Sequence, residues 1–345
     1  MKLKDHVQER NKLYKNFLAF CRNNTVTVKD IAHFGAKRMR QAKLHPHFLA
    51  DHSLKSTALY LAFFALNLPY EYTNQHYLNQ KITEQDADNI LQLFEKRISK
   101  RIPAEYITHE SYYLDRSFYV NEHVLVPRSL MNTRFVDFLK SAQWENYRVL
   151  DLCTGSGCIG ISLALLNPKI TVDLADISSE ALAVALVNIK KYDLSNRVKC
   201  IQSDLFQNIQ DKYDIIITNP PYVPLSEYHQ QPVEVKNEPE IALKAGIDGL
   251  DIIDSIIINS KFYLNSNGIL ISEVGYPAAK QLKKKYPKIP FQWFKYRHPS
   301  RKESILDKFC QWIGYLDSIF LCKAKDLPSM VASKSRSAAD LPKDN

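Results

Sequence analysis

Residues 148–160 read R-V-L-D-L-C-T-G-S-G-C-I-G, a short apolar run that leads into a glycine-rich turn. Gly155 and Gly157 permit a tight turn and a close approach of the backbone to a ligand, and Gly160 lets a following helix pack against the strand. The stretch therefore predicts a buried strand, a ligand-binding loop and a helix in succession. Taken alone, the G-x-G-x-x-G spacing is a weak signal, and it also suits a dinucleotide, because Asp176 follows Gly155 by 21 residues.

Downstream of this stretch, strand-like runs alternate with helix-like segments. The runs I-T-V-D-L-A-D, V-K-C-I-Q-S-D and Y-D-I-I-I-T-N are apolar and rich in β-branched residues, whereas S-E-A-L-A-V-A-L-V-N-I has helical spacing. A helix is expected around 249–264, followed by the strands G-I-L-I-S-E-V, F-Q-W-F-K-Y and S-I-F-L-C-K-A. This alternation predicts an α/β fold, with a parallel sheet covered by helices on both faces.

The remaining parts of the chain have other patterns. Residues 1–100 contain few glycines and show helical spacing, which indicates a small helical domain. The segment 106–126 is rich in aromatic and β-branched residues and indicates a β-hairpin within a linker at 101–132. The α/β domain then spans 133–325. Residues 326–345 have little to bury, which predicts a disordered tail.

Polar side chains stand at the ends of four successive predicted strands, at Asp151, Asp176, Asp204 and Asn219. The three carboxylates suit an ammonium group, ribose hydroxyls and an adenine amine, which S-adenosylmethionine presents in that order. A dinucleotide would bring its phosphates close to Asp151, which would repel them. Each aspartate taken singly is equally consistent with a helix cap or a turn. The set of four favours a site for S-adenosylmethionine.

The run Y-D-I-I-I-T ends in N-P-P-Y, residues 219–222. Proline cannot donate to a sheet ladder, so the strand stops at Asn219 and the turn is stiff. A planar amino group is a poor nucleophile, because its lone pair is conjugated. The Asn219 side-chain oxygen and the Pro220 carbonyl can each accept one of its hydrogens, while the Tyr222 ring stacks on it. The turn therefore predicts methyl transfer to an sp² NH₂, either an amide or an adenine.

The 345-residue chain carries a formal net charge of +9, concentrated in two segments. Residues 1–45 hold eleven Lys/Arg against three acids, residues 276–302 hold nine Lys/Arg and no acid, and the stretch 135–275 is acidic. Two basic blocks on an otherwise acidic chain suggest an anionic partner such as RNA. For any single lysine, a solvated face is the simpler interpretation.

Cysteine use and hydropathy exclude several classes of protein. The six cysteines form no C-x-x-C pair and no Cys/His cluster at zinc-like spacing, so neither a metal site nor a disulfide framework is expected. The first 20 residues are too charged for a secretory signal, and the longest apolar stretch, 58–66, is far shorter than the roughly 20 residues that span a bilayer. A cytoplasmic protein is therefore expected.

Five segments of the chain resemble one family. They read P-A-E-Y-I-T-H-E, F-Y-V-N-E-H-V-L-V-P-R-S, L-D-L-C-T-G-S-G-C-I-G, N-P-P-Y-V and N-E-P-E-I-A-L-K-A-G-I-D-G-L-D, and together they cover roughly residues 100–275. The chain is similar to the protein-glutamine methyltransferases of translation proteins, and V-P-R-S resembles the branch acting on ribosomal protein three of the large subunit. The resemblance implies a helical substrate-docking domain, a β-hairpin linker and a seven-stranded Rossmann-like methyltransferase core that uses S-adenosylmethionine.

The resemblance also implies roles for individual residues. Asn219, Pro220 and Tyr222 would hold the substrate glutamine. The cofactor would be held around the glycine turn and the strand ends, by Asp151, Thr154, Gly155, Gly157, Asp176, Ile177, Asp204, Leu205 and Asn219. The implied partner is a large-subunit ribosomal protein, with ribosomal RNA meeting the basic segments 1–45 and 276–302.

Three features depart from the family pattern. His109 stands where glycine is favoured, Leu130 stands where proline is favoured after R-S, and residues 298–316 are longer than the family's late hairpin. The first two departures affect the positioning of the hairpin, and the third affects the docking surface. None of them lies in N-P-P-Y.

Other functions fit parts of the sequence. A sister branch of the family modifies peptide chain release factors. A DNA adenine methyltransferase also uses N-P-P-Y, but it must flip its base and read sequence, and the acidic stretch 135–275 contains no inserted recognition domain. A nucleic-acid-binding module with a vestigial pocket is disfavoured by the intact glycine turn and N-P-P-Y. A dehydrogenase is disfavoured by Asp151.

Overall fold

The structure, a computed structural model, describes residues 14–45, 53–69, 75–131, 145–295 and 317–328. Several expectations from the sequence concern other residues. The start of the α/β domain at 133, the longer segment 298–316 and the tail beyond residue 328 lie outside the described residues.

The chain divides into two compact units, and the chain crosses between them more than once. The first unit comprises Met1–Arg128 with Gln230–Glu240, and the second comprises Ser129–His229 with Ile241–Asn345. We call them the helical unit and the α/β unit, and each is described by itself.

The helical unit has its core between the helices that the N-terminal sequence predicts. Its elements are β1 (Val26–Thr27), α2 (Val28–Gln41), α3 (Leu54–Ala65), η1 (Gln75–Asn79), β2 (Lys81–Ile82), α4 (Glu84–Lys100) and α5 (Ala104–Thr108). Both α2 and α4 begin with a capping box, in which a threonine and an aspartate three residues later satisfy each other's backbone N–H groups. The apolar faces of α2, α3 and α4 share one core, in which Ile31, Leu61 and Ile90 are fully buried.

A β-hairpin follows these helices, as the sequence predicts. Its strands β3 (Glu110–Tyr113) and β4 (Arg116–Tyr119) pair antiparallel, with Glu110 opposite Tyr119. The two connecting residues, Leu114 and Asp115, both have positive φ, at 51° and 58°. Positive φ at both central residues is the mark of a type I′ turn, whose twist matches that of the paired strands.

His109 stands where the family pattern has glycine, and its backbone explains that preference. It follows α5 in a left-handed conformation, with φ 53°. The His109 Nδ1 lies 3.3 Å from the Val120 carbonyl oxygen, and the imidazole stacks on Tyr119 with ring centroids 5.7 Å apart. Glycine is favoured at such a helix end because it has no Cβ. The histidine therefore holds a conformation that favours glycine, and its ring contacts the hairpin.

We expect His109→Gly to be more stable than His109→Ala. Both variants lose the imidazole contacts, but only alanine places a Cβ in the left-handed conformation, which costs about 1 kcal/mol. Denaturant unfolding of the two variants measures this difference in the free energy of unfolding. Equal stabilities would mean that residue 109 does not hold a positive φ in solution.

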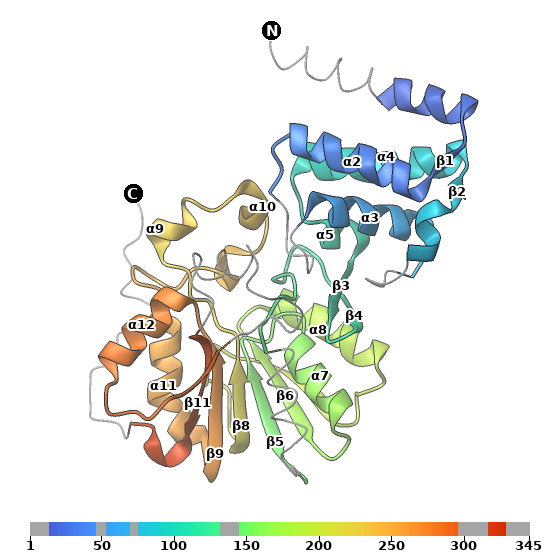
Figure 1. Cartoon of the computed structure of the whole chain (residues 1–345). Coiled ribbons are helices and arrows are strands. Elements are labelled where there is room, and N and C mark those ends of the chain that lie inside the picture. Colours follow the sequence, from blue (N-terminus) through green and yellow to red (C-terminus); the bar gives the residue numbers. More distant parts are fainter. Residues whose placement is uncertain (1–13, 46–52, 70–74, 132–144, 296–316, 329–345) are drawn as a thin grey trace. The chain divides into compact units, whose positions relative to one another are not determined.

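A seven-stranded sheet in the order β10-β11-β9-β8-β5-β6-β7 organises the α/β unit (Figure 1). Its strands are β5 (Arg148–Leu152), β6 (Thr171–Asp176), β7 (Val198–Gln202), β8 (Tyr213–Thr218), β9 (Leu264–Glu273), β10 (Gln292–Lys295) and β11 (Asp317–Lys323). The α/β class and the seven-stranded core are thus confirmed. The expected parallel pairing holds from β7 to β9, whereas β11 pairs antiparallel with both β9 and β10.

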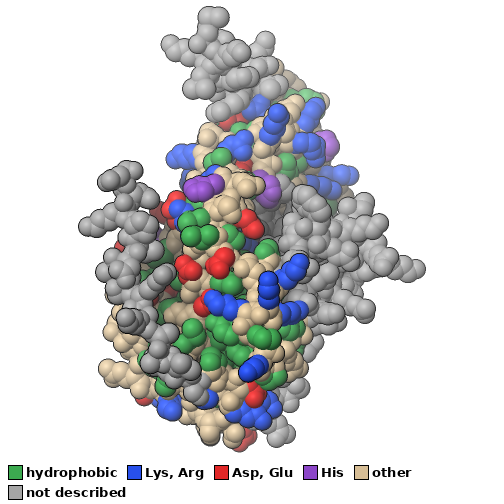
Figure 2. Space-filling model, turned by 90° about the vertical axis from the view of Figure 1, so that its left-hand side faces the viewer, with side chains coloured by type: hydrophobic (Ala, Val, Ile, Leu, Met, Phe, Trp, Pro, Cys, Tyr) green, Lys and Arg blue, Asp and Glu red, His purple; other side chains and the backbone are tan. Residues whose placement is uncertain are grey.

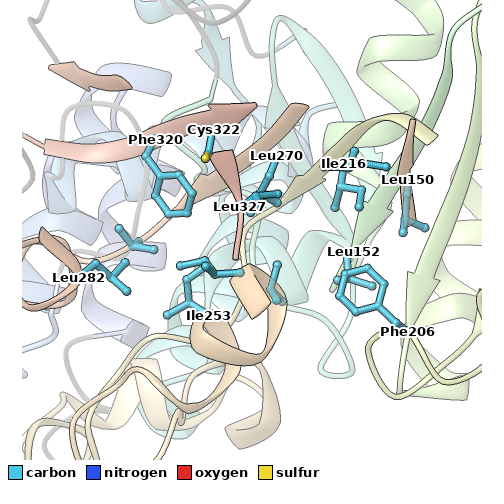
Figure 3. Packing of buried hydrophobic residues seen from close by; sticks show 14 of the residues in the cluster. Leu150, Leu152, Phe206, Ile216, Ile253, Leu270, Leu282, Phe320, Cys322 and Leu327 are labelled. Carbon is cyan, nitrogen blue, oxygen red and sulfur yellow. The ribbon is translucent and has the colours of Figure 1, made fainter. Parts of the chain in front are cut away.

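Helices cover both faces of this sheet, as the alternating pattern predicts. Figure 1 shows α11 (Asp251–Tyr263) and α12 (Tyr276–Lys285) on one side of the sheet, and α7 (Cys158–Leu166) and α8 (Ser179–Lys191) on the other. On the first face, Leu150, Ile216, Ile253 and Leu282 belong to one buried cluster (Figure 3). On the second, α7 approaches β6 so closely that a Cβ on Gly160 would lie 2.4 Å from the Leu174 Cδ2 atom.

Short elements complete the described chain. The helices α9 (Leu225–Tyr228), α10 (Val233–Lys236) and η2 (Glu240–Ala242) lie between β8 and α11, and η3 (Ala324–Asp326) follows β11. Among the helices that the structure describes, none combines the length and the apolar character needed to cross a membrane.

Candidate functional site

The candidate site lies at the carboxyl ends of β5 and β8. From β5 the chain builds outward through β6 and β7 and then returns to the other side of β5 as β8, so the strand order reverses between β5 and β8. Open α/β sheets bind ligands outside the strand ends at such a point. The Thr218 hydroxyl of β8 donates to the Leu152 carbonyl oxygen of β5 at 2.6 Å, which ties these two ends together. Directly after them come residues 153–157, which we call the glycine loop, and residues 219–222, the N-P-P-Y turn.

Asp151 lies beneath the glycine loop and supports it. Its side chain is fully buried, and its Oδ2 accepts hydrogen bonds from the Thr154 hydroxyl at 2.7 Å and from the Gly160 N–H at 2.8 Å. The Thr154 N–H in turn donates to the Ala175 carbonyl oxygen at 3.0 Å. One carboxylate oxygen therefore joins the strand, the loop and the first turn of α7.

The other carboxylate oxygen of Asp151, Oδ1, is available to accept a hydrogen bond from a ligand. Among the described residues, Oδ1 is buried and has no hydrogen-bond partner. Burial raises the pKa of Asp151 to about 7, against the opposing effect of the hydrogen bonds from Thr154 and Gly160. A buried polar atom without a partner is costly. A cation or an N–H group placed at Oδ1 would remove that cost and favour the ionised carboxylate.

Asp176 ends β6 and fastens the loop from the side. Its Oδ2 accepts from the Gly155 N–H at 2.8 Å, and its Oδ1 accepts from the Ser178 N–H at 3.0 Å. Burial raises the pKa of Asp176 despite these bonds. The next residue, Ile177, is 46% exposed, which is unusual for isoleucine and leaves an apolar surface beside the carboxylate.

The charges of three strand-end carboxylates all influence one group, the thiol of Cys153. Burial raises the pKa of this cysteine, and the charges of Asp176, Asp151 and Asp204 add to the effect. Asp204 itself accepts from the Gln207 amide at 3.0 Å. The structure therefore brings together the carboxylates that the sequence places on separate strands.

Two non-glycine residues at this edge hold positive φ, Cys153 at 58° and Leu205 at 47°. Such conformations cost free energy, and they persist only where the surrounding structure enforces them. Gly155 and Gly157 also have positive φ, at 55° and 80°, so the loop bends sharply just beyond the end of β5.

The N-P-P-Y turn presents a second polar atom without a partner. β8 ends at Thr218, and Pro220 is buried directly after it. Within the described part of the chain, the Asn219 Oδ1 is buried and accepts no hydrogen bond. Two buried oxygens without a hydrogen-bond partner, those of Asp151 near the end of β5 and of Asn219 just after β8, thus lie at the two strands between which the order reverses. A planar group that carries N–H donors would satisfy the one on Asn219.

Tyr222 is held by backbone packing on two sides. A Cβ on Gly249, whose φ is 79°, would lie 2.6 Å from the Tyr222 carbonyl oxygen. A Cβ on Gly275 would lie 3.0 Å from the Tyr222 ring. Beyond the turn, Val223 forms a parallel bridge with Lys244. These contacts hold the Tyr222 ring and backbone in position.

Sequence reasoning missed three supporting residues. Gly249 and Gly275 are the first two, and the I-D-G-L-D wording around Gly249 was a possible signal. The third is Asn188 of α8, which is fully buried and donates from Nδ2 to the Ser156 carbonyl oxygen of the glycine loop at 2.9 Å. An asparagine on the buried face of an otherwise apolar helix is a signal that the sequence does contain.

The residues of the site have the chemistry of ligand binding and positioning. In the ranges that the structure covers, no group of three or more His, Cys, Asp or Glu side chains could hold a metal ion. The arrangement offers carboxylates, a glycine loop and a side-chain amide oxygen beside a fixed aromatic ring. It can hold a polar ligand across β5, β6 and β7 and a planar amino group at the end of β8.

Comparisons with known proteins identify a matching family, similar sequences and a similar solved structure. Residues 133–236 match the family described as "Methyltransferase small domain". The ribosomal protein uL3 glutamine methyltransferase of Neisseria gonorrhoeae is 38% identical over 272 residues, which cover 77% of this chain and 89% of that protein. The protein of the same name from Burkholderia pseudomallei is 36% identical over 260 residues, covering 72% and 84%. Among solved structures, a ribosomal protein L11 methylase from Lactobacillus delbrueckii subsp. bulgaricus matches with 21% identity and a TM-score of 0.35, covering 50% of this chain and 78% of that one.

Proposed function

Since the chain belongs to the family of the ribosomal protein uL3 glutamine methyltransferases, we propose that it methylates the side-chain amide nitrogen of a glutamine in a large-subunit ribosomal protein. The methyl donor is S-adenosylmethionine. The observation that carries the proposal is the buried, unpartnered Oδ1 of Asn219 at the end of β8, where a primary amide would supply the missing donor.

The residues at the strand ends fit the cofactor. The unpartnered Oδ1 of Asp151 suits the ammonium group, Asp176 beside the exposed Ile177 suits the ribose and one face of the adenine, and Asp204 with Leu205 suits the rest of the base. Thr154, Gly155 and Gly157 shape the loop over which the cofactor lies. When bound, S-adenosylmethionine supplies a methyl group on a positively charged sulfur, which is electrophilic without further activation.

The N-P-P-Y turn prepares the glutamine nitrogen for attack. Asn219 Oδ1 and the Pro220 carbonyl accept the two amide hydrogens, which fixes the plane of the amide and draws positive charge to its hydrogens. The Tyr222 ring, positioned by Gly249 and Gly275, stacks on that plane and excludes water. The nitrogen then presents one face to the methyl group. As the N–C bond forms, the methyl–sulfur bond would break, S-adenosylhomocysteine would leave, and the methylated nitrogen, now strongly acidic, would release one proton to solvent. Orientation and fixed dipoles carry the rate, and no strong base is required.

We expect the affinity for S-adenosylmethionine to rise with pH. The pKa of Asp151 in the free protein is about 7, and an ammonium group binds its ionised form. Below this pKa the carboxyl is protonated, so binding must release a proton and weakens by up to about tenfold per pH unit. Calorimetry between pH 5.5 and 7.5 should show an increase of about tenfold or more in affinity. Asp151→Asn should abolish the dependence, and a flat profile in the unmodified enzyme would refute the ammonium role.

The helical unit offers a surface suited to the anionic partner that the charge pattern suggests. The exposed residues of α2 include Lys29, His33, Lys37 and Arg40, spaced at four, four and three residues, whereas the opposite face is buried. Within the described residues, neither Lys37 nor Arg40 forms an ion pair, although Asp30 lies near Lys29. Basic side chains also gather in the upper part of Figure 2, where Figure 1 shows α2 and α4. We propose that this stripe contacts ribosomal RNA that accompanies the substrate protein.

The second basic segment is partly occupied by internal contacts. Lys285 pairs with Asp254, and Lys283 lies over the Trp293 ring at 4.7 Å. The described part of 276–302 is therefore the weaker candidate for RNA.

Salt dependence tests the RNA proposal. The double variant Lys37→Gln/Arg40→Gln should bind a ribosomal RNA fragment more weakly, with the slope of log K against log salt reduced by about one to two. The matched control is Lys190→Gln/Lys191→Gln, which removes two exposed lysines at the end of α8. Equal slopes in both variants would exclude α2 as the contact.

Competing substrates distinguish the remaining functions. Purified enzyme is incubated with labelled S-adenosylmethionine and, separately, with large-subunit assembly particles, release factors and duplex DNA. Label in a large-subunit protein supports the proposal. Label only in release factors assigns the chain to the sister activity, and label in adenine makes it a DNA methyltransferase.

An enzyme of ribosomal proteins would act in the cytoplasm, where those proteins are made.

A further inference from the structure

The chain that leaves the N-P-P-Y turn forms a loop that is fastened at two places. We call residues 223–245 the return loop. Its base lies in the α/β unit, where the Val223 N–H donates to the Leu243 carbonyl oxygen at 2.8 Å and the Ala245 N–H donates to Val223 at 3.0 Å. Its middle, Gln230–Glu240, belongs instead to the helical unit. A loop that begins one residue after Tyr222 is thus anchored in both units.

Glu234 makes the first of the anchors in the helical unit. Its side chain is 1% exposed, and its Oε1 accepts from the Arg101 Nη1 at 2.8 Å and from the His45 N–H at 3.1 Å. The fully buried Arg97 places its Nη1 4.0 Å from the same oxygen. An acid on a four-residue helix, α10, thereby meets cations from the end of α4.

Glu238 makes the second anchor, four residues further along the chain. It is 2% exposed and accepts from the Val126 N–H at 2.8 Å and from the Arg128 Nη1 at 2.7 Å, through the same Oε2. A third contact comes from Asn237, whose side-chain Nδ2 donates to the Arg101 carbonyl oxygen at 2.9 Å.

We propose that Glu234 and Glu238 are positioning residues for catalysis, which hold the return loop so that the N-P-P-Y turn keeps its geometry. This inference rests on the proposed methyl transfer at that turn. Removing two carboxylates from water is costly, and it adds little to stability compared with apolar packing. Surface loops are ordinarily the parts of a protein that open most readily. The two buried ion pairs therefore hold the return loop in position. Through them the helical unit contributes to kcat as well as to docking.

The test uses Glu238→Gln in the full-length enzyme. Glutamine keeps an acceptor for the Val126 N–H but loses the charge that binds Arg128. We expect kcat to fall about tenfold or more, while Kd for S-adenosylmethionine and KM for the ribosomal protein change less than about threefold. Arg101→Gln, whose side chain is 32% exposed, is the milder second variant if Glu238→Gln does not fold. It should lower kcat in the same selective way.

The control is Arg38→Gln, which breaks the 3.1 Å ion pair between Arg38 of α2 and Glu95 of α4 in the same unit. It should lower the thermal stability but leave kcat unchanged, because this pair does not touch the return loop. If the control and Glu238→Gln lower kcat equally at equal loss of stability, the anchors are merely structural and the proposal is wrong.

Hydrogen exchange supplies a readout that does not depend on the substrate. In Glu238→Gln and Arg101→Gln, the amides of Val223, Leu225 and Ala245 should exchange faster, by about tenfold or more, and in Arg38→Gln they should not. Unchanged exchange at these amides overturns the inference even if methyl transfer is observed. An unmodified enzyme that methylates no ribosomal protein refutes the proposed function instead, while the exchange result still decides whether the anchors hold the loop.

Discussion

Asn219→Ala is expected to lower kcat by about 100-fold or more, the scale measured when a preorganised hydrogen-bonding group at a reacting centre is removed. The buried Oδ1 of Asn219 has no hydrogen-bond partner among the described residues, which leaves it available for the substrate amide that we propose. The affinity for S-adenosylmethionine should stay within about threefold, because the carboxylates and the glycine loop are untouched. Initial rates with saturating substrates, together with cofactor titration by calorimetry, measure the two quantities.

The matched control for this variant is Asn259→Ala. Asn259 lies in α11 and is half-buried, and its amide donates to the Ser255 carbonyl oxygen of its own helix. It should leave kcat unchanged. A kcat for Asn219→Ala within about threefold of the unmodified enzyme would remove Asn219 from the reacting centre.

Asp176→Ala is expected to weaken S-adenosylmethionine binding by about 1 to 3 kcal/mol, which is a factor of roughly 5 to 150 in Kd. The substitution removes the buried carboxylate that we propose as the acceptor for ribose hydroxyls, and it also frees the Gly155 N–H that this carboxylate holds at 2.8 Å. Calorimetry with S-adenosylhomocysteine, which does not turn over, gives the change in affinity.

A double-mutant cycle separates the two roles of Asp176. The ligands are S-adenosylhomocysteine and its 2′-deoxyribose analogue, and the proteins are the unmodified enzyme and Asp176→Ala. If the carboxylate binds the ribose, the analogue should lose affinity in the unmodified enzyme and much less in the variant. Equal losses in both proteins would limit Asp176 to bracing the glycine loop.

The sheet and the strand-end residues could be predicted because their signals are local. β5, β6 and β8 are short apolar runs with a polar residue at or next to their last position, and such runs in parallel order bring their ends to one edge. The antiparallel β11 could not be predicted from its run, since pairing direction depends on the path of the chain rather than on composition. The positive φ of His109 could not be predicted from the residue itself, although the glycine that the family pattern has at this position indicates such a conformation.

The supporting contacts of the site could not be predicted, because they join residues far apart in sequence. Asp151 was recognised as a strand-end carboxylate, but its complete burial under the loop depends on how α7 packs. Glu234 and Glu238 meet Arg101 and Arg128 across 133 and 110 residues, and no local pattern marks an ion pair of that span. Local sequence patterns indicate strand ends and turns, whereas the partners of buried charges are visible only in the folded molecule.

Tandem mass spectrometry of the methylated large-subunit protein, isolated after reaction with labelled S-adenosylmethionine, assigns the transferred methyl group to one atom. We predict a single methyl group on the side-chain amide nitrogen of a glutamine, present with the unmodified enzyme and absent with Asn219→Ala. A methyl group on a lysine, an arginine or a chain terminus, or a glutamine methylated equally well by Asn219→Ala, would contradict the assignment of this turn as the place where an amide nitrogen is methylated.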